Sequence, residues 1–261
     1  MILTFTHINK KMKFLFVEAF YNKEVKLNEE ALKLLSKYKT IGLFAAVQFV
    51  KLDEVKKQLK EKGMKVLSSK AKRTSTENQI LGCDCFSDSF DNELFEKVDA
   101  LLYIGDGMFH PKALLLAQKD LKKEKPVIIF DPLSGSAKFL TKRDIEKQVK
   151  RYQVNVLKYL HAKNVGVLVS TKTGQQYLNY ALLLKERAKA SSLDKSFYIF
   201  VGDTLEMREM ENFPFIDAWV NTACPRIGTD DIMNFPQAMI NINDALKLTS
   251  NNFNEEFKIV G

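Results

Sequence analysis

The chain has 261 residues, a formal net charge of +8 from 40 basic and 32 acidic side chains, and 46% hydrophobic residues. This balance predicts a globular protein with one large or two small domains and excludes a disordered or collagen-like chain. Because it has neither an apolar run of about 18 residues nor a secretory signal, we expect a cytoplasmic protein without a membrane segment.

Short runs rich in Val, Ile and Phe alternate with longer amphipathic stretches, which is typical of strand-helix-strand units with a parallel sheet. Strands are predicted at Lys13 to Ala19, Lys39 to Val47, Lys65 to Ser68, Ala100 to Ile104 and Val127 to Phe130. Helices are predicted at Asn28 to Ser36, between the strand at Lys39 to Val47 and Lys62, and from Thr141 to Ala162. Asn28 is the expected N-cap of the first helix, and Gly63 the expected left-handed cap that ends the second.

The strand pattern restarts after the long helix. KTIGLFAAVQ, from Lys39, resembles KNVGVLVSTK, from Lys163, and VDALLYIGDG, from Val98, resembles IDAWVNTACP, from Ile216. The matched positions lie about 120 residues apart in both cases. Although strands of any parallel sheet share such features, the pattern predicts two similar α/β domains, each with a small parallel sheet flanked by helices.

Most lysines alternate with acidic residues at helical spacing, as in Glu54 to Lys65 and Gln118 to Lys125. This spacing favours solvated helix faces, with a basic docking surface as the alternative. No RNA-binding motif is present, so we expect no direct nucleic-acid binding.

Glycine and polar residues follow two of the predicted strands, where parallel sheets bind ligands. The run GDGMFHP, from Gly105, contains a glycine turn that lets a ligand approach the backbone. His110 is either an acid, base or donor or a structural histidine. Asp131 either holds a ligand hydroxyl or amine or forms an Asx turn. The phosphate-binding glycine motifs are absent, which argues against nucleoside triphosphate use.

The chain has three cysteines, Cys83 and Cys85 in QILGCDC and Cys224 in NTACPR. They are too few for a disulfide framework, so metal or redox chemistry and simple burial are the alternatives. Arg226 could lower the pKa of the Cys224 thiol or bind an anion. Thiolates favour zinc or iron-sulfur clusters, but the paired C-x-x-C motifs of zinc ribbons are absent.

Four segments together resemble the diphthamide synthase family, the 2-(3-amino-3-carboxypropyl)histidine synthases. The segments are IGLFAAVQFV from Ile41, QILGC ending at Cys83, YIGDGMFHP from Tyr103 with Asp131-Pro132 after it, and TACPR from Thr222 with Phe235-Pro236 after it. Their order and approximate spacing match from about Met12 to the end of the chain. Each motif alone is modest, but the set is specific.

The resemblance implies three similar α/β domains around a 4Fe-4S cluster that is held by one cysteine from each domain. It also implies a radical reaction, in which the 3-amino-3-carboxypropyl group of S-adenosylmethionine moves to a histidine of translation elongation factor 2, leaving methylthioadenosine. Cys83 and Cys224 match two cluster ligands. From their places at strand ends, the residues expected to line the S-adenosylmethionine pocket or its rim are Gln48, Gly105, His110, Asp131 and Arg226.

The resemblance accounts for only two of the family's three domains. Residues 1–23 are expected to be a remnant or linker of the first domain, 24–145 the middle domain and 146–261 the last domain. A second subunit or a separate first domain would then supply the third cysteine, unless Cys85 substitutes for it. We therefore expect a truncated or split component of the synthase that acts in the first step of diphthamide biosynthesis. The alternatives are a noncatalytic accessory subunit of the same complex and a small-molecule-binding α/β protein without a cluster.

Overall fold

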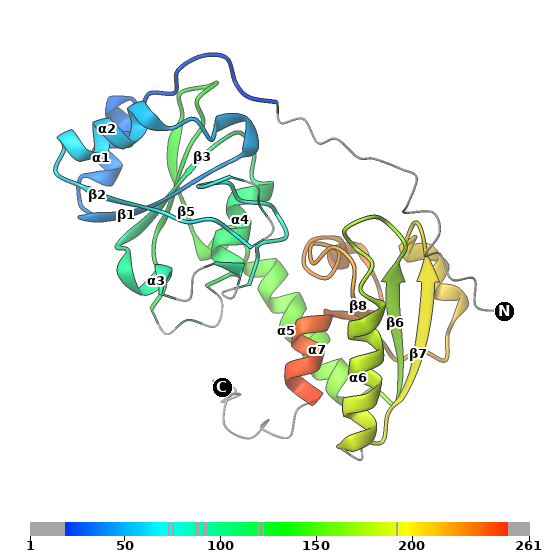
Figure 1. Ribbon diagram of the computed structural model, residues 1–261. Coiled ribbons are helices and arrows are strands. Elements are labelled where there is room, and N and C mark those ends of the chain that lie inside the picture. The colour runs from blue at the N-terminus through cyan, green and yellow to red at the C-terminus, as the bar shows by residue number, and fades with distance from the viewer. Residues whose placement is uncertain are drawn as a thin grey trace. The chain divides into compact units, whose positions relative to one another are not determined.

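The computed structural model describes residues 19–249, apart from 73, 75, 87–88, 91–92, 119–120, 122 and 192 (Figure 1). The strand predicted at Lys13 to Ala19 therefore lies, except for its last residue, outside the described residues. The chain divides into two compact units. Of the described residues, unit 1 comprises those within 19–81, 87–111 and 120–140, and unit 2 those within 82–86, 112–119 and 141–249.

Unit 1 is built on a five-stranded sheet in the order β2-β1-β3-β4-β5, called sheet A. Its strands are β1 (Thr40–Ala45), β2 (Lys65–Ser68), β3 (Ala100–Ile104), β4 (Val127–Phe130) and β5 (Ala137–Leu140). The first four run parallel, and β5 pairs antiparallel with β4. The helices are α1 (Glu29–Leu35), α2 (Asp53–Glu61), α3 (Leu94–Lys97) and α4 (Phe109–Leu116), with a 3-10 turn η2 (Val47–Phe49) after β1. All residues of β3 and β4 are buried, as expected for central strands of a covered parallel sheet.

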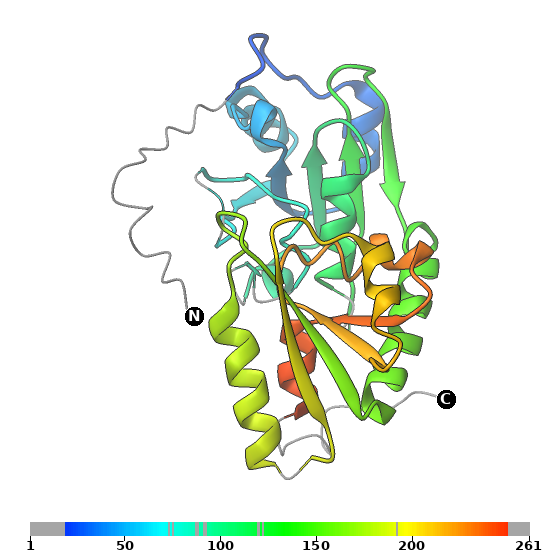
Figure 2. The same ribbon diagram turned by 90° about the vertical axis from the view of Figure 1, so that its right-hand side faces the viewer.

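Unit 2 is built on a four-stranded, all-parallel sheet in the order β7-β6-β8-β9, called sheet B. Its strands are β6 (Asn164–Ser170), β7 (Ser196–Gly202), β8 (Ala218–Asn221) and β9 (Ala238–Asn241). Its helices are α5 (Glu146–His161), α6 (Leu178–Ala190) and α7 (Ile242–Thr249), drawn green, yellow-green and red in Figure 2. The 3-10 turns are η4 (Lys142–Asp144), η5 (Met207–Asn212) and η6 (Asp231–Asn234).

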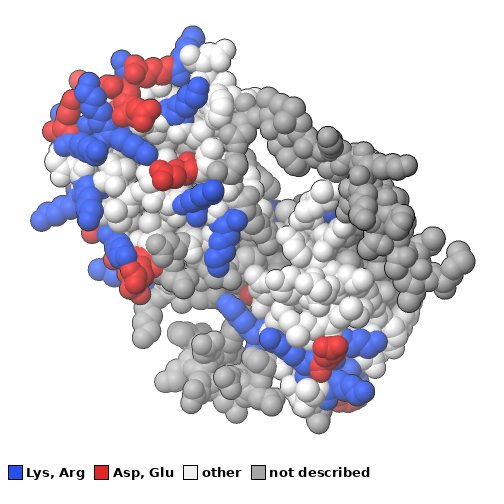
Figure 3. All heavy atoms as spheres, in the orientation of Figure 1, with Lys and Arg blue, Asp and Glu red and all other residues white. Residues whose placement is uncertain are grey.

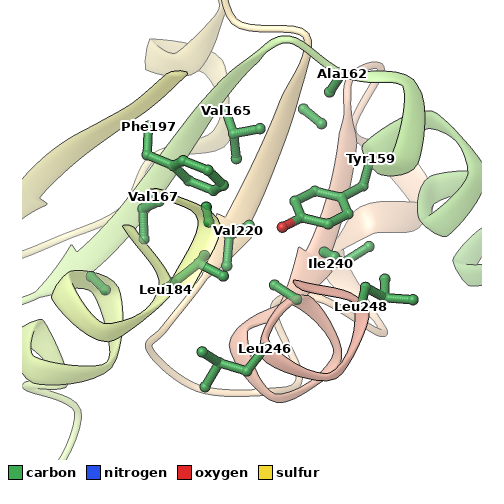
Figure 4. Packing of buried hydrophobic residues seen from close by; sticks show 14 of the residues in the cluster. Tyr159, Ala162, Val165, Val167, Leu184, Phe197, Val220, Ile240, Leu246 and Leu248 are labelled. Atoms are coloured by element: carbon green, nitrogen blue, oxygen red, sulfur yellow. The ribbon is translucent and has the colours of Figure 1, made fainter. Parts of the chain in front are cut away.

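Alternate residues of sheet B enter two separate cores, because successive side chains of a strand point to opposite faces. On the helix-covered face, Val165, Val167 and Val220 pack with Tyr159 of α5 and Leu184 of α6 (Figure 4). The other face carries Leu168, Trp219 and Met239, which pack against residues of the connecting turns. Sheet B is therefore covered by helices on one face and by loops on the other.

No helix in the described part of the chain is long and apolar enough to span a membrane.

The structure confirms the predicted strands at Lys65–Ser68, Ala100–Ile104 and Val127–Phe130 with the same bounds. Asn28 caps α1 as predicted, accepting a hydrogen bond from the Ala31 N–H at 2.9 Å. Gly63 has the predicted left-handed conformation, with a φ of 76°.

The strand predicted at Lys39 to Val47 is observed at Thr40–Ala45, and two other differences from the predictions are larger. The long helix begins at Glu146 and not at Thr141, because Thr141 and Asp144 form a capping box around η4. Strand β5 was not predicted, and it adds an antiparallel edge to a sheet that was expected to be parallel throughout.

The two sheets repeat the same plan, as predicted from the sequence. If β5 is left out, the order β2-β1-β3-β4 in sheet A corresponds strand by strand to β7-β6-β8-β9 in sheet B. Asp99 accepts hydrogen bonds from the backbone N–H groups of Lys39 and Thr40, and Asp217 accepts the equivalent pair from Lys163 and Asn164, at 3.0 and 2.8 Å in both units. These bonds lower the pKa of Asp99.

The glycine shared by the two repeats also has the same packing role. A Cβ at Gly42 would lie 2.9 Å from the side chain of Leu101, and one at Gly166 would lie 2.4 Å from the ring of Trp219. In each unit, the glycine therefore makes room for a large side chain of the neighbouring strand.

Candidate functional site

Three of the predicted site residues lie at one edge of sheet A. Gln48 is in η2 directly after β1, Gly105 directly follows β3, and Asp131 directly follows β4. Because β1, β3 and β4 are parallel neighbours, their carboxyl ends meet at the same edge. The Gln48 amide donates a hydrogen bond to Asp106 at 3.1 Å, which joins the first two of these loops. The predicted clustering at this edge is therefore observed.

Tyr103 is a buried polar group directly beneath this edge. Its side chain is fully buried, and its hydroxyl has no hydrogen-bond partner among the described residues. Burial raises the pKa of the Tyr103 phenol well above its ordinary value, and the negative charges of Asp106 and Asp131 raise it further. A Cβ at Gly105 would lie 2.5 Å from the Tyr103 hydroxyl, so only glycine fits beside this ring. The phenol therefore keeps its proton across the physiological pH range.

Asp131 forms the Asx turn that was one of its two predicted roles. It accepts hydrogen bonds from the Leu133 N–H at 2.8 Å and from the Ser134 hydroxyl at 2.7 Å. Partial burial raises the pKa of Asp131, but these hydrogen bonds and one from the Ser134 backbone outweigh it, and the net pKa is lowered. Asp131 is therefore an ionised turn residue at neutral pH, and its role toward a ligand stays a prediction.

His110 lies in the first turn of α4 and is half-buried. Its ring contacts that of Phe109 edge to face, with 5.3 Å between the ring centroids. Both predicted roles of His110, structural and acid-base, stay predictions.

In unit 2, Cys224 lies in the connection between β8 and β9, residues 222–237, here called the Cys224 loop. Asn221, at the end of β8, donates to the Cys224 carbonyl and to the Asn241 side chain, both at 2.8 Å, and accepts from the Ala223 N–H at 3.0 Å. Asn241, its register partner on β9, donates to the Pro225 carbonyl at 3.0 Å. Buried hydrogen bonds of this kind fix the backbone on both sides of the cysteine.

Helix α5 holds the other end of the Cys224 loop through polar side chains on one face. Gln148 donates to the Asp230 carboxylate at 3.3 Å, and Arg151 donates to the Phe235 carbonyl at 2.5 Å. Asn155 donates to the Met239 carbonyl at 2.9 Å, just beyond the loop. The spacing of three and four residues places these three side chains on the same face of the helix. The loop is thus anchored at both ends.

Arg226 is buried within the Cys224 loop and forms an ion pair with Asp230, four residues on. One partner of this guanidinium is therefore a carboxylate of its own loop. Its two predicted roles, toward the Cys224 thiol and toward an anion, stay predictions.

The three cysteines all belong to unit 2. Cys83 and Cys224 are partly exposed, whereas Cys85 is only 2% exposed and lines a cavity of about 20 Å³, enough for one water molecule. Cysteine thiolates are the usual ligands of iron-sulfur clusters. However, no group of three or more His, Cys, Asp or Glu side chains in the described part of the chain is placed to hold a metal ion. The described residues therefore offer single candidate ligands and not a complete metal site.

Four residues that shape the edge of sheet A and the Cys224 loop were not among the predicted site residues: Tyr103, Asp106, Asn221 and Asn241. The asparagines carry a recognisable signal, because each is the last residue of a buried strand and the two strands are neighbours. Tyr103 carries no such signal, since an aromatic residue in a buried strand is ordinary.

Comparisons with known proteins agree with this architecture. The family model of diphthamide synthesis proteins matches residues 3–258. The 2-(3-amino-3-carboxypropyl)histidine synthase of Pyrococcus horikoshii is 31% identical over 83% of this chain and 60% of its own length. That of Methanocaldococcus jannaschii is 26% identical over 97% of this chain and 66% of its own length.

A solved structure shares the fold. Dph2 from Pyrococcus horikoshii, solved with a 4Fe-4S cluster, has a TM-score of 0.70 and 26% identity over 91% of this chain and 65% of that one. The chain thus spans less than two thirds of the Pyrococcus horikoshii protein in both comparisons. The match of the family model along nearly the whole chain and the shared fold show that this chain belongs to the diphthamide synthesis protein family.

Proposed function

We propose that the chain acts in the first step of diphthamide biosynthesis, the transfer of a 3-amino-3-carboxypropyl group from S-adenosylmethionine to a histidine of translation elongation factor 2. Family membership supports this reaction class. The observation that carries the proposal for this chain is the partly exposed Cys224 thiol, on a loop that is hydrogen-bonded at both ends. A rigid loop with a free thiol is suited to ligating a metal.

Cys83 and Cys224 are the proposed thiolate ligands of a 4Fe-4S cluster. When bound, such a cluster supplies the electron for cleavage of S-adenosylmethionine. Asn221 and Asn241 hold the backbone around Cys224, so the thiol can bind without reordering the loop. The proposed source of the third ligand is a partner chain or a separate first domain, with Cys85 of this chain as the alternative. The solved relative with its cluster supports the choice of metal group.

Within unit 1, the proposed S-adenosylmethionine contacts are Gln48, Gly105, His110 and Asp131. Gly105 leaves the backbone open to close approach, and the Asp106 and Asp131 carboxylates attract a positively charged sulfonium or ammonium group. Within unit 2, Arg226 is the proposed anion-binding residue. The relatives from Schizosaccharomyces pombe and Homo sapiens are named subunit 1 of the synthase, which supports a partner chain.

Release of methylthioadenosine tests the proposal. The chain is purified anaerobically, both alone and together with a coexpressed candidate for the partner chain or domain that would supply the third cluster ligand. Each preparation is incubated with dithionite, S-adenosylmethionine and elongation factor 2. We expect methylthioadenosine from the preparation that retains iron and sulfide, and none after iron is removed by chelation. Iron without methylthioadenosine would instead indicate a noncatalytic accessory subunit, and neither product nor iron in either preparation would refute the proposal.

A further inference from the structure

A pocket of about 210 Å³ lies beside β7 in unit 2. Strands β6, β7 and β8 and the segment through η5 supply its apolar lining: Leu168, Phe200, Leu205, Met210, Phe213 and Trp219. The only charged residues that line it are Glu206 and Glu209. None of the site residues predicted from the sequence lines this pocket, so it is separate from the sites described above.

Three aromatic rings form the pocket's inner surface. Phe200 lies 4.6 Å from Phe213 and 5.0 Å from Trp219, measured between ring centroids. Trp219 is fully buried while the two phenylalanines are partly exposed, so the indole forms the closed end. The Trp219 N–H donates to the Gln237 side chain at 2.6 Å. The indole therefore needs no polar partner from the pocket, and the partly exposed rings of Phe200 and Phe213 present π surface to a ligand.

The two carboxylates give the pocket a negative charge in a chain of net charge +8. Glu206 and Glu209 are exposed, and neither forms an ion pair with any residue that the structure describes. Aromatic faces attract cations through their quadrupole, and carboxylates accept paired hydrogen bonds from a guanidinium. Rings and acids in one pocket of this size favour a single cationic side chain with an apolar stem.

We propose that this pocket binds an arginine side chain of a partner protein. The planar guanidinium stacks on Phe200 or Phe213 and donates to Glu206 and Glu209, while its methylene stem packs on Leu205 and Met210. Lysine lacks the planar donor fork and is expected to bind more weakly. The charge complementarity and the aromatic lining carry this inference, which does not rest on the proposed enzymatic function.

The fluorescence of Trp219 offers a direct test, because it is the only tryptophan of the chain. The full chain is titrated with N-acetyl-arginine amide, with N-acetyl-lysine amide, and with N-acetyl-citrulline amide as a neutral probe of nearly the same shape. We expect a saturable change with the arginine probe at a Kd on the order of 1 mM, as suits so small a ligand. The citrulline probe is expected to cause none.

Two glutamine variants locate the binding site. Glu209→Gln is expected to weaken arginine binding by about fivefold or more, since it removes a carboxylate from the pocket. Glu211→Gln, on the same η5 turn but outside the lining, is the matched control and is expected to stay within about twofold. An equal response to citrulline, equal effects of the two variants, or no saturable change up to about 20 mM arginine probe would overturn the proposal.

Discussion

Asp230→Ala is expected to lower the free energy of unfolding of unit 2 by about 3 kcal/mol. Asp230 forms the ion pair with Arg226, whose side chain is only 5% exposed, and it accepts the hydrogen bond from Gln148 of α5. Truncation leaves a buried guanidinium without this carboxylate and releases one anchor of the Cys224 loop. Urea unfolding followed by the fluorescence of Trp219 measures the change, because Trp219 lies in sheet B.

The matched control is Asp194→Ala, which removes an ion pair with Lys163 in the same unit. Both of its side chains are largely exposed and the two charged atoms lie 3.8 Å apart, so the expected loss is below about 0.5 kcal/mol. If the two variants cost the same, the Arg226–Asp230 pair does not hold the Cys224 loop in the way described.

Cys83→Ser and Cys224→Ser are each expected to lower the bound iron by about tenfold or more. The assay measures iron and acid-labile sulfide in the anaerobic preparation that retains the cluster. This is either the chain alone or the chain coexpressed with the candidate partner that would supply the third ligand. Serine keeps the size of the side chain while removing the thiolate, so folding should be preserved, and the urea transition of Trp219 checks this.

Cys85→Ala is the control for the cysteine variants. Cys85 is buried beside a cavity that holds at most a water molecule, so its removal is expected to leave the iron content unchanged. Unchanged iron in both serine variants, or a loss of iron only in Cys85→Ala, would show that the ligand assignment is wrong.

The repeated sheet could be predicted from the sequence because its central strands are short, apolar runs buried on both faces. Val127–Phe130 is such a run, and its predicted bounds agree with the structure. Strand β5 was missed because AKFL is a four-residue edge strand with two exposed residues in its middle, and its pairing depends on the turn formed around Asp131.

The candidate site was only partly predictable, because some of its contacts depend on strand register and turns that local sequence patterns do not specify. Gln48, Gly105 and Asp131 each follow an apolar run, so their meeting at one sheet edge follows from parallel topology alone. The hydrogen bond between Asn221 and Asn241 depends on the register of two strands that are 20 residues apart, and the Asp230 pairing of Arg226 depends on the turn in between. Such contacts are set by tertiary packing, which local patterns do not contain.

We propose that this chain's cysteines serve the transfer of a 3-amino-3-carboxypropyl group to elongation factor 2. The most direct measurement uses S-adenosylmethionine labelled with ¹⁴C in that group and counts the label in elongation factor 2 after an anaerobic reaction. We predict label in the factor with the unaltered chain and none above background with Cys224→Ser in the same preparation. Equal labelling with both chains, or no labelling from an iron-loaded unaltered chain, would contradict the account.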